Sequence, residues 1–200
     1  MTNLDKLQGS IVAIVTPFNQ DGSIDYPAYQ ELVNWQIASS TKAILVCGTT
    51  GETPTLEADE YAELIQTTVA IVDHRVPVIA GTGTNSTAKT IANCQLAQKL
   101  GADAVLVVGP YYNKPTPKDF YEHFSAISRA TTLPIIIYNI PGRTGKNIPA
   151  STIVHLATEH KNILAVKEAS DDLGQIIQIL ATRPAGFKLF SGDDAITLPI

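Results

Sequence analysis

Two short apolar segments each end in a side chain that can do chemistry. Residues 135–139 are Ile-Ile-Ile-Tyr-Asn and residues 163–168 are Ile-Leu-Ala-Val-Lys-Glu, so Tyr138 and Lys167 stand where the apolar runs stop. A lysine at such a position is partly desolvated, which lowers the pKa of its ammonium from about 10.4. The neutral amine can attack a carbonyl carbon, and a neighbouring tyrosine can carry protons to and from the imine. The pair predicts Schiff-base chemistry; the ordinary alternative is a lysine that reaches water past apolar surface.

Three further groups could bind a carboxylate or move protons. The stretch Gly48–Glu52 offers two threonine hydroxyls and several backbone N–H groups between a predicted strand and a predicted helix start, where the helix dipole favours an anion. A tight turn with a threonine N-cap is the alternative. Tyr111 and Tyr112 offer either two phenols or packing surface. Arg143 offers either a bidentate carboxylate ligand or a solvated loop side chain.

The elements that must position these groups recur about every 30 residues, as strand-like runs separated by helical patterns. The predicted strands lie near Ile11–Val15, Ala43–Cys47, Val76–Ala80, Ala104–Val108, Ile135–Tyr138, Ile163–Val166 and Phe187–Phe190. The predicted helices lie near Tyr26–Ala38, Tyr61–Val69, Ala88–Leu100, Asp119–Arg129, Pro149–Thr158 and Leu173–Ala181. Polar, glycine-rich and aromatic residues collect after the strands, not before them.

This order predicts an α/β fold, a TIM (β/α)8 barrel, because the chemistry of such barrels lies at the carboxyl ends of their strands. A doubly wound sheet is the competing architecture, but the segment Thr16–Phe18 after the first strand is not a glycine-rich dinucleotide fingerprint. Residues 1–200 are expected to form one barrel domain. A closed barrel needs an eighth strand and about 250 residues, so only seven strands are expected here and the domain looks truncated before the eighth.

Composition narrows the function class. The net charge is −5 and no lysine or arginine cluster forms a stripe, which argues against nucleic acid. The first residues carry no leader pattern and no apolar run is long enough to cross a membrane, so a cytoplasmic location is expected. Cys47 and Cys94 are too few for a disulfide framework and are expected to be reduced. The four histidines lack metal or triad spacing, so no metal site is predicted.

Taken together, four motifs resemble the dihydrodipicolinate synthase (4-hydroxy-tetrahydrodipicolinate synthase) family of pyruvate-dependent class I aldolases. The resemblance extends from about Gly9 to Ile200. Its motifs are Gly48–Glu52, Tyr111–Tyr112, Tyr138–Gly145 and Lys167–Ala169, in this order and at these separations, with Ser191–Asp194 following.

The resemblance implies a role for each matching residue. Lys167 would form the Schiff base with pyruvate, and Tyr138 would transfer protons through a relay that includes Thr49 and Tyr112. Thr50 would hold the pyruvate carboxylate. Arg143 would bind the carboxylate of the second substrate, L-aspartate 4-semialdehyde, and the sugar-acid relatives generally lack this arginine. No metal or organic cofactor is implied, because the imine itself is the electron sink.

The resemblance also implies a homo-oligomer, a dimer or tetramer, with Tyr112 reaching into a neighbour's site. Asn85 and Tyr111 match the lysine feedback site of the family, but Lys89 stands where a glutamate binds the effector's ammonium. Like charge repels, so weak feedback inhibition by lysine is expected. An eighth strand that helps form the pyruvate pocket, and a C-terminal helical region, are implied for the family but absent from these 200 residues.

Two rivals remain open from sequence. One is another class I pyruvate aldolase, such as N-acetylneuraminate lyase or a sugar-acid aldolase, which would use Lys167 and Tyr138 on a different aldehyde. The other is a truncated barrel without turnover that binds a keto acid or a partner. Activity with a panel of aldehydes separates the three hypotheses.

Overall fold

The computed structural model describes residues 7–200, in two compact units. Unit 1 comprises Met1–Thr82 and Leu96–Val105, and unit 2 comprises Gly83–Gln95 and Leu106–Ile200. Residues 1–6, from which the absence of a leader was predicted, lie outside the described residues. No helix within residues 7–200 is both long enough and apolar enough to cross a membrane.

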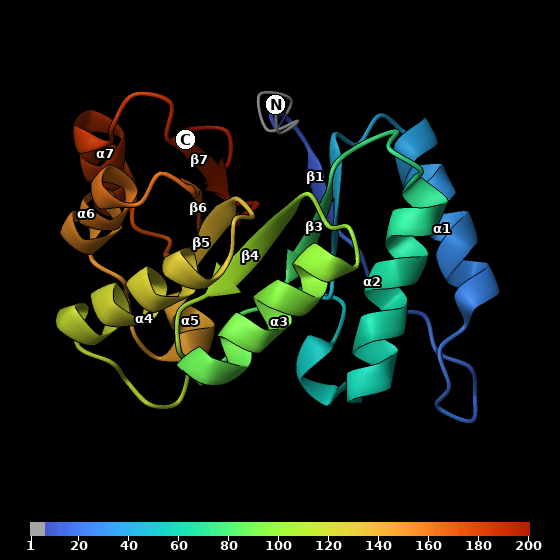
Figure 1. Cartoon of the computed structure of the whole chain (residues 1–200). Helices are drawn as coiled ribbons and strands as arrows, with labels where there is room; N and C mark the ends of the chain where they lie inside the picture. Colours follow the sequence, from blue (N-terminus) through green and yellow to red (C-terminus); the bar gives the residue numbers. More distant parts are fainter. Residues whose placement is uncertain (1–6) are drawn as a thin grey trace. The chain divides into compact units, whose positions relative to one another are not determined.

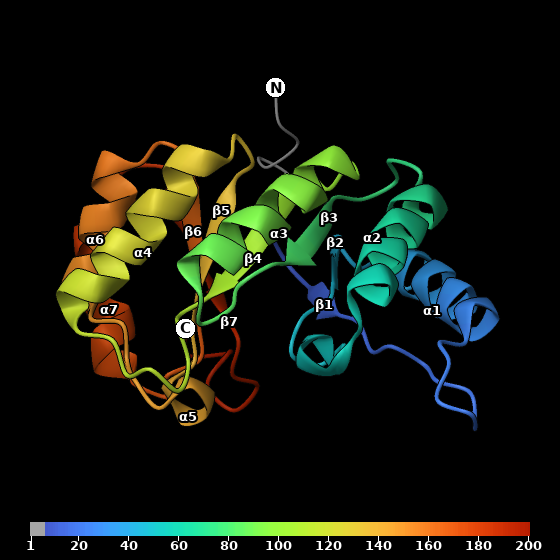
Figure 2. The ribbon, with the colours of Figure 1, turned by 60° about the horizontal axis from the view of Figure 1, so that its bottom comes forward.

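Unit 1 is built on three parallel strands, in the order β1-β2-β3. Its elements are β1 (Ile11–Ala13), α1 (Tyr26–Ala38), β2 (Ala43–Val46), the short 3₁₀ helix η2 (Thr53–Thr55), α2 (Ala58–Val72) and β3 (Val78–Gly81). All residues of β2 and β3 are buried, as their unbroken apolar sequences predict. Helices α1 and α2 pack side by side, and both views show them together (Figures 1 and 2).

Two elements carry the boundary between the units, α3 (Thr87–Lys99) and β4 (Ala104–Val108). The start of α3 is capped by Ser86, whose hydroxyl accepts a hydrogen bond from the Lys89 backbone N–H at 3.3 Å. Gly101 follows the helix with φ +92°, a conformation that only glycine adopts readily.

Unit 2 contains three parallel strands in the order β5-β6-β7. Its remaining elements are α4 (Pro117–Ala130), β5 (Ile135–Asn139), α5 (Pro141–Thr144), α6 (Ala150–Glu159), β6 (Ile163–Glu168), α7 (Leu173–Thr182) and β7 (Lys188–Ser191). Helix α6 packs against both α4 and α7, as Figure 1 shows. The register places Tyr138 beside Lys167 and Asn139 beside Glu168.

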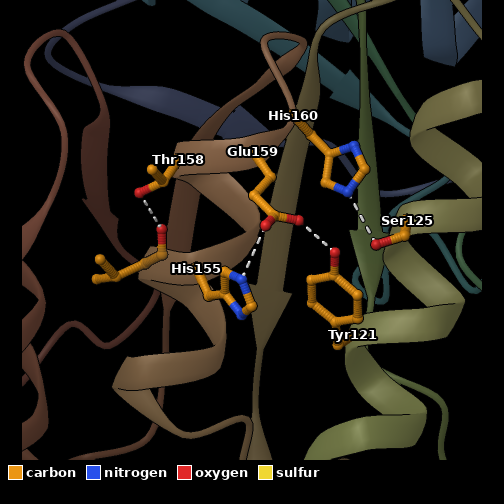
Figure 3. Close-up of polar contacts among 7 residues, drawn as sticks. Tyr121, Ser125, His155, Thr158, Glu159 and His160 are labelled. Atoms are coloured by element: carbon orange, nitrogen blue, oxygen red, sulfur yellow. Dashed lines mark hydrogen bonds and ion pairs between the residues drawn. The ribbon is translucent and has the colours of Figure 1, made fainter.

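A polar cluster joins α4 to the C-terminal end of α6 (Figure 3). The Tyr121 hydroxyl donates to Glu159, whose other carboxylate oxygen lies 3.1 Å from Nε2 of His155. The His155 ring stacks on the Tyr121 ring, and the Ser125 hydroxyl lies 2.8 Å from Nε2 of His160. His155 and His160 therefore link the end of α6 to α4 through their side chains.

The turn after β2 differs from the prediction. No α-helix follows Gly48–Glu52 directly. The short 3₁₀ helix η2 comes next, and α2 begins only at Ala58. The start of α2 is fixed by a capping box in which the Glu57 backbone N–H donates to the Glu60 carboxylate at 2.8 Å. The prediction that an α-helix begins directly after Gly48–Glu52, with a dipole that favours an anion there, is therefore wrong. An anion bound in this turn would rely on the backbone N–H groups of the turn itself.

Candidate active site

The site begins with the two side chains that end β5 and β6. Because Tyr138 and Lys167 are register partners on adjacent parallel strands, their side chains leave the sheet on the same face. The Lys167 Nζ lies 4.4 Å from the centroid of the Tyr138 ring. Tyr138 is buried, whereas Lys167 is half-buried. The predicted pairing of the amine with the phenol is thus present in the structure.

The surroundings of Lys167 favour its neutral amine. Burial lowers the pKa of the Lys167 ammonium below its usual value, and the carboxylate of Asp194, just after β7, partly opposes this shift. A depressed pKa leaves more of the amine unprotonated near neutral pH, which is the form that attacks a carbonyl carbon. The expectation of a lowered pKa is confirmed in direction.

Gly192 lies directly against the side chain of Lys167. A Cβ atom at this position would lie only 2.7 Å from Cε and 3.2 Å from Cγ of Lys167, so any side chain here would displace the lysine. The Gly192 backbone N–H donates to the Glu168 carbonyl oxygen at 2.7 Å, which holds the chain close to β6. Sequence reasoning missed this glycine, because nothing local distinguishes it from a turn glycine.

Arg143 lies on α5, the short helix directly after β5. Its side chain is exposed and forms no ion pair within residues 7–200. The turn beneath it is firm, because the buried Thr144 hydroxyl lies within hydrogen-bond distance of the Ile140 and Lys146 carbonyl oxygens, at 3.1 and 2.9 Å. Gly145 then ends the helix with φ +74°. A rigid turn with an uncommitted guanidinium suits the binding of a substrate carboxylate.

Tyr112 lies in the loop after β4 and is 89% exposed, with φ +70°. The loop is anchored by its neighbour Asn113, whose side-chain amide donates to the Asn85 carbonyl oxygen at 3.0 Å. The tyrosine therefore stands out from a fixed loop and is not packed against its own unit. Its predicted role in a proton relay stays a prediction.

Thr49 and Thr50 belong to unit 1, in the turn after β2, and both are exposed. The turn is closed by the Gly51 N–H, which donates to the Gly48 carbonyl oxygen at 3.1 Å. The Thr16 hydroxyl, from the segment after β1, donates to the Gly51 carbonyl oxygen at 2.8 Å. The structure brings Lys167 and Tyr138 together within unit 2, while the roles of the two threonines stay predictions.

The other nucleophilic and metal-ligating residues do not form a second site. Cys47 and Cys94 are buried and are not joined in a disulfide, and burial raises the pKa of the Cys47 thiol to about 12. Within residues 7–200, no three histidine, cysteine or acidic side chains gather as metal ligands would. Asp172 caps α7 by accepting a hydrogen bond from the Gln175 N–H at 3.0 Å.

Comparison with known proteins identifies the family. A model of the dihydrodipicolinate synthetase family matches residues 6–200. The chain belongs to this family. The family resemblance that the sequence motifs indicated is therefore confirmed.

Individual relatives agree with this assignment. The chain is 48% identical over 194 residues to a 4-hydroxy-tetrahydrodipicolinate synthase of Chlorobium phaeobacteroides, covering 97% of this chain and 65% of the relative. It is 50% identical to the enzyme of that name from Neisseria meningitidis, covering 96% and 66%. The chain thus spans slightly less than two thirds of the length of these relatives.

A solved structure settles the fold class. The dihydrodipicolinate synthase of Aquifex aeolicus superposes with a TM-score of 0.94 at 46% identity, covering 96% of this chain and 66% of that one. The predicted α/β fold of the TIM-barrel class is confirmed, with seven strands in the described residues. The doubly wound alternative is excluded.

Proposed function

We propose that the protein containing this chain is a lyase, 4-hydroxy-tetrahydrodipicolinate synthase, of lysine and diaminopimelate biosynthesis. It would condense pyruvate with L-aspartate 4-semialdehyde. The observation that carries the proposal is the Lys167 amine, 4.4 Å from the Tyr138 ring centroid and depressed in pKa, in a chain of this family. Relatives that share about half of its residues bear this enzyme's name.

The first step is the attack of the neutral Lys167 amine on the ketone carbon of pyruvate. The carbinolamine loses water, and Tyr138, next to the amine on β5, would protonate the departing hydroxyl. The resulting iminium draws electrons, so a methyl proton leaves and an enamine forms. Tyrosine with a pKa near 10 is a poor free base at neutral pH, which favours a concerted hydroxyl relay through Thr49 and Tyr112.

The second step joins the two substrates. The enamine carbon would attack the aldehyde carbon of the semialdehyde, and the semialdehyde's own amine would then displace Lys167 as the ring closes. Thr50 would hold the pyruvate carboxylate, and the exposed guanidinium of Arg143 would hold the carboxylate of the semialdehyde. The imine supplies the electron sink, so the scheme needs no metal or organic cofactor.

We further propose that the protein is a cytoplasmic homo-oligomer. Tyr112 supports this, because a tyrosine that is 89% exposed on an anchored loop is suited to contact another subunit. Sedimentation of the purified full-length protein measures the assembly. A protein that stays monomeric at all concentrations and is fully active would contradict the proposal.

The substrate assignment is tested with the full-length protein, pyruvate and a panel of aldehydes: aspartate semialdehyde, N-acetylmannosamine and short sugar aldehydes. Turnover is expected with the semialdehyde. In Arg143→Ala, the KM for the semialdehyde should rise about 10- to 100-fold, because a charge-assisted bond of about 1.5–3 kcal/mol is lost. Formation of the pyruvate imine should be unchanged.

Lys161→Ala is the matched control, since it removes another exposed cation, in the segment between α6 and β6. It should leave all rates unchanged. Turnover of N-acetylmannosamine in place of the semialdehyde would instead assign a sugar-acid aldolase. A pyruvate adduct without turnover of any aldehyde would contradict the lyase proposal.

A further inference from the structure

Glu168 is a charged residue placed where charge is costly. It follows Lys167 on β6, so its side chain leaves the opposite face of the strand from the reactive amine. Its exposed fraction is 0%. Within residues 7–200 it forms no ion pair with a lysine or arginine. A buried, unpaired carboxylate is retained only where its hydrogen bonds are well satisfied.

Two amides from different elements bind this carboxylate. Asn139, at the end of β5, donates from Nδ2 to one oxygen at 2.7 Å. Gln175, in the first turn of α7, donates from Nε2 to the other oxygen at 3.0 Å. Burial raises the pKa of Glu168, and the bonds from Gln175 and Asn139 oppose that shift. Both oxygens accept, which is the arrangement of an ionised carboxylate.

The backbone N–H of Ile148 fixes which atoms of the side-chain amides are donors in this network. The Ile148 backbone N–H donates to Oδ1 of Asn139 at 3.0 Å, so Nδ2 of Asn139 must face Glu168. Asn147 then accepts from Asn139 at 2.7 Å and donates to Oε1 of Gln175 at 2.6 Å. The network therefore has one consistent set of donors and acceptors, and it joins β5, β6, α7 and the segment before α6.

The network lies one residue from the reacting pair. Asn139 and Glu168 are register partners, as are Tyr138 and Lys167 immediately before them. The Ala169 N–H also donates to the Asn139 carbonyl oxygen at 2.9 Å. The side-chain bonds therefore hold the two strands together at the point where the phenol and the amine must meet.

We propose that Glu168 is a positioning residue: with Asn139, Asn147 and Gln175 it aligns the ends of β5 and β6 and so sets the approach of Tyr138 to Lys167. This inference rests on the proposed Schiff-base function. Proton transfer is sensitive to geometry, and a misplacement of about 1 Å can cost about 10²-fold in rate. The network touches no substrate itself and acts through the two residues beside it.

An exchange of amide and carboxylate tests the proposal in the full-length protein. In Glu168→Gln one N–H donor would face another donor, and in Gln175→Glu two carboxylates would face each other. The rate of pyruvate imine formation, followed by borohydride quenching, should fall about 10- to 100-fold in each. The pyruvate concentration for half-saturation should change less than about threefold, because binding groups are untouched.

The double variant Glu168→Gln/Gln175→Glu restores one donor and one acceptor at this contact. Its rate of imine formation should be at least about tenfold higher than that of either single variant. Two independent substitutions would instead lower the rate further, so the recovery measures the coupling of the two side chains. Asn147→Ala, at the exposed end of the network, should lower the rate of imine formation by a smaller factor. It tests the proposal if a variant at a buried position does not fold. Glu159→Gln is the matched control, since it makes the same chemical change at a surface carboxylate (Figure 3).

All rates are compared at least about 20 °C below each variant's unfolding midpoint, so that unfolded protein does not contribute. Wild-type imine formation in the folded Glu168→Gln protein, or no recovery in the double variant, would overturn the proposal. Failure of the wild-type protein to form any pyruvate adduct would instead overturn the proposed function. The two failures are therefore distinguishable.

Discussion

Two glutamates of unit 2 each have two hydrogen-bonding partners but lie in opposite surroundings. Glu168, on β6, accepts hydrogen bonds from two amides and is fully buried. Glu159, at the end of α6, accepts from the Tyr121 hydroxyl and contacts His155, but it lies at the surface (Figure 3). Burial raises the pKa of Glu168, whereas the hydrogen bonds from Tyr121 and His155 lower the pKa of Glu159.

Buried and exposed hydrogen bonds differ in how much they contribute to the stability of the protein. At the surface, water replaces a lost hydrogen-bond partner, so the cluster around Glu159 contributes little to the free energy of unfolding. In the interior no water replaces the partner, and an unmatched donor or acceptor bears its full desolvation cost. The buried polar groups of unit 2 should therefore govern its stability, although the exposed cluster looks equally well connected.

The largest effect is expected at His123, the buried histidine of α4. Burial lowers the pKa of His123 to about 4, from 6.5 in an unfolded chain. Between these values the unfolded state binds more protons, so stability is complete above about pH 6.5 and is lost as the pH falls toward 4. The loss should be about 3 kcal/mol, measured by urea unfolding across this range.

His123→Asn should lack this part of the pH dependence, while its amide can still bond to the Thr87 hydroxyl, which lies 2.8 Å from Nδ1 of the histidine. His155→Asn, at the exposed cluster, should keep the wild-type pH dependence. If the free energy of unfolding of the two variants depended on pH in the same way, the predicted difference between buried and exposed groups would be wrong.

The direct comparison of the two glutamates should give the next largest effect. Glu168→Gln should lower the free energy of unfolding by about 2 kcal/mol at pH 7, because one buried bond to a charged acceptor is replaced by two opposed donors. Glu159→Gln should leave the urea midpoint unchanged within error. A midpoint shift of similar size in both variants would mean that burial does not decide the contribution.

The smallest effect on stability is expected at Gly192, beside Lys167. Gly192→Ala would place a methyl group 2.7 Å from Cε of Lys167, 3.2 Å from Cγ of Lys167 and 3.1 Å from Cβ of Ala169. The end of the lysine can move aside, and the two other contacts need a shift of only a few tenths of an ångström. Thermal unfolding should therefore change little, while the rate of pyruvate imine formation falls about tenfold because the amine is displaced. An unaltered rate would show that Lys167 has another way to reach pyruvate.

The sequence predicted the elements well where the signal is local. Helix Tyr26–Ala38 and strand Ala104–Val108 were placed with their observed bounds, because hydrophobic periodicity and caps act over a few residues. The third strand was expected from Val76 but begins at Val78. Pro77 explains the difference, since it has no N–H to give to a sheet. The GTTGE turn misled because the Glu57–Glu60 capping box, farther along, sets the helix start.

The pairing of Tyr138 with Lys167 was also predictable, since both residues end apolar strands. Glu168 was not: its network depends on side chains from β5, α7 and the segment before α6, which no local pattern connects. A charged residue at a strand position that alternation assigns to the buried face was the available signal. Gly192 gave none, because its role depends on the neighbouring Lys167 side chain.

The Schiff-base proposal is tested most directly by the intact mass of the full-length protein after incubation with pyruvate and borohydride, which reduces an imine to a stable secondary amine. We expect one pyruvate-sized adduct per chain, absent in Lys167→Ala and retained in Lys161→Ala. An adduct that persists without Lys167, or the absence of any adduct on the folded wild-type protein, would contradict it.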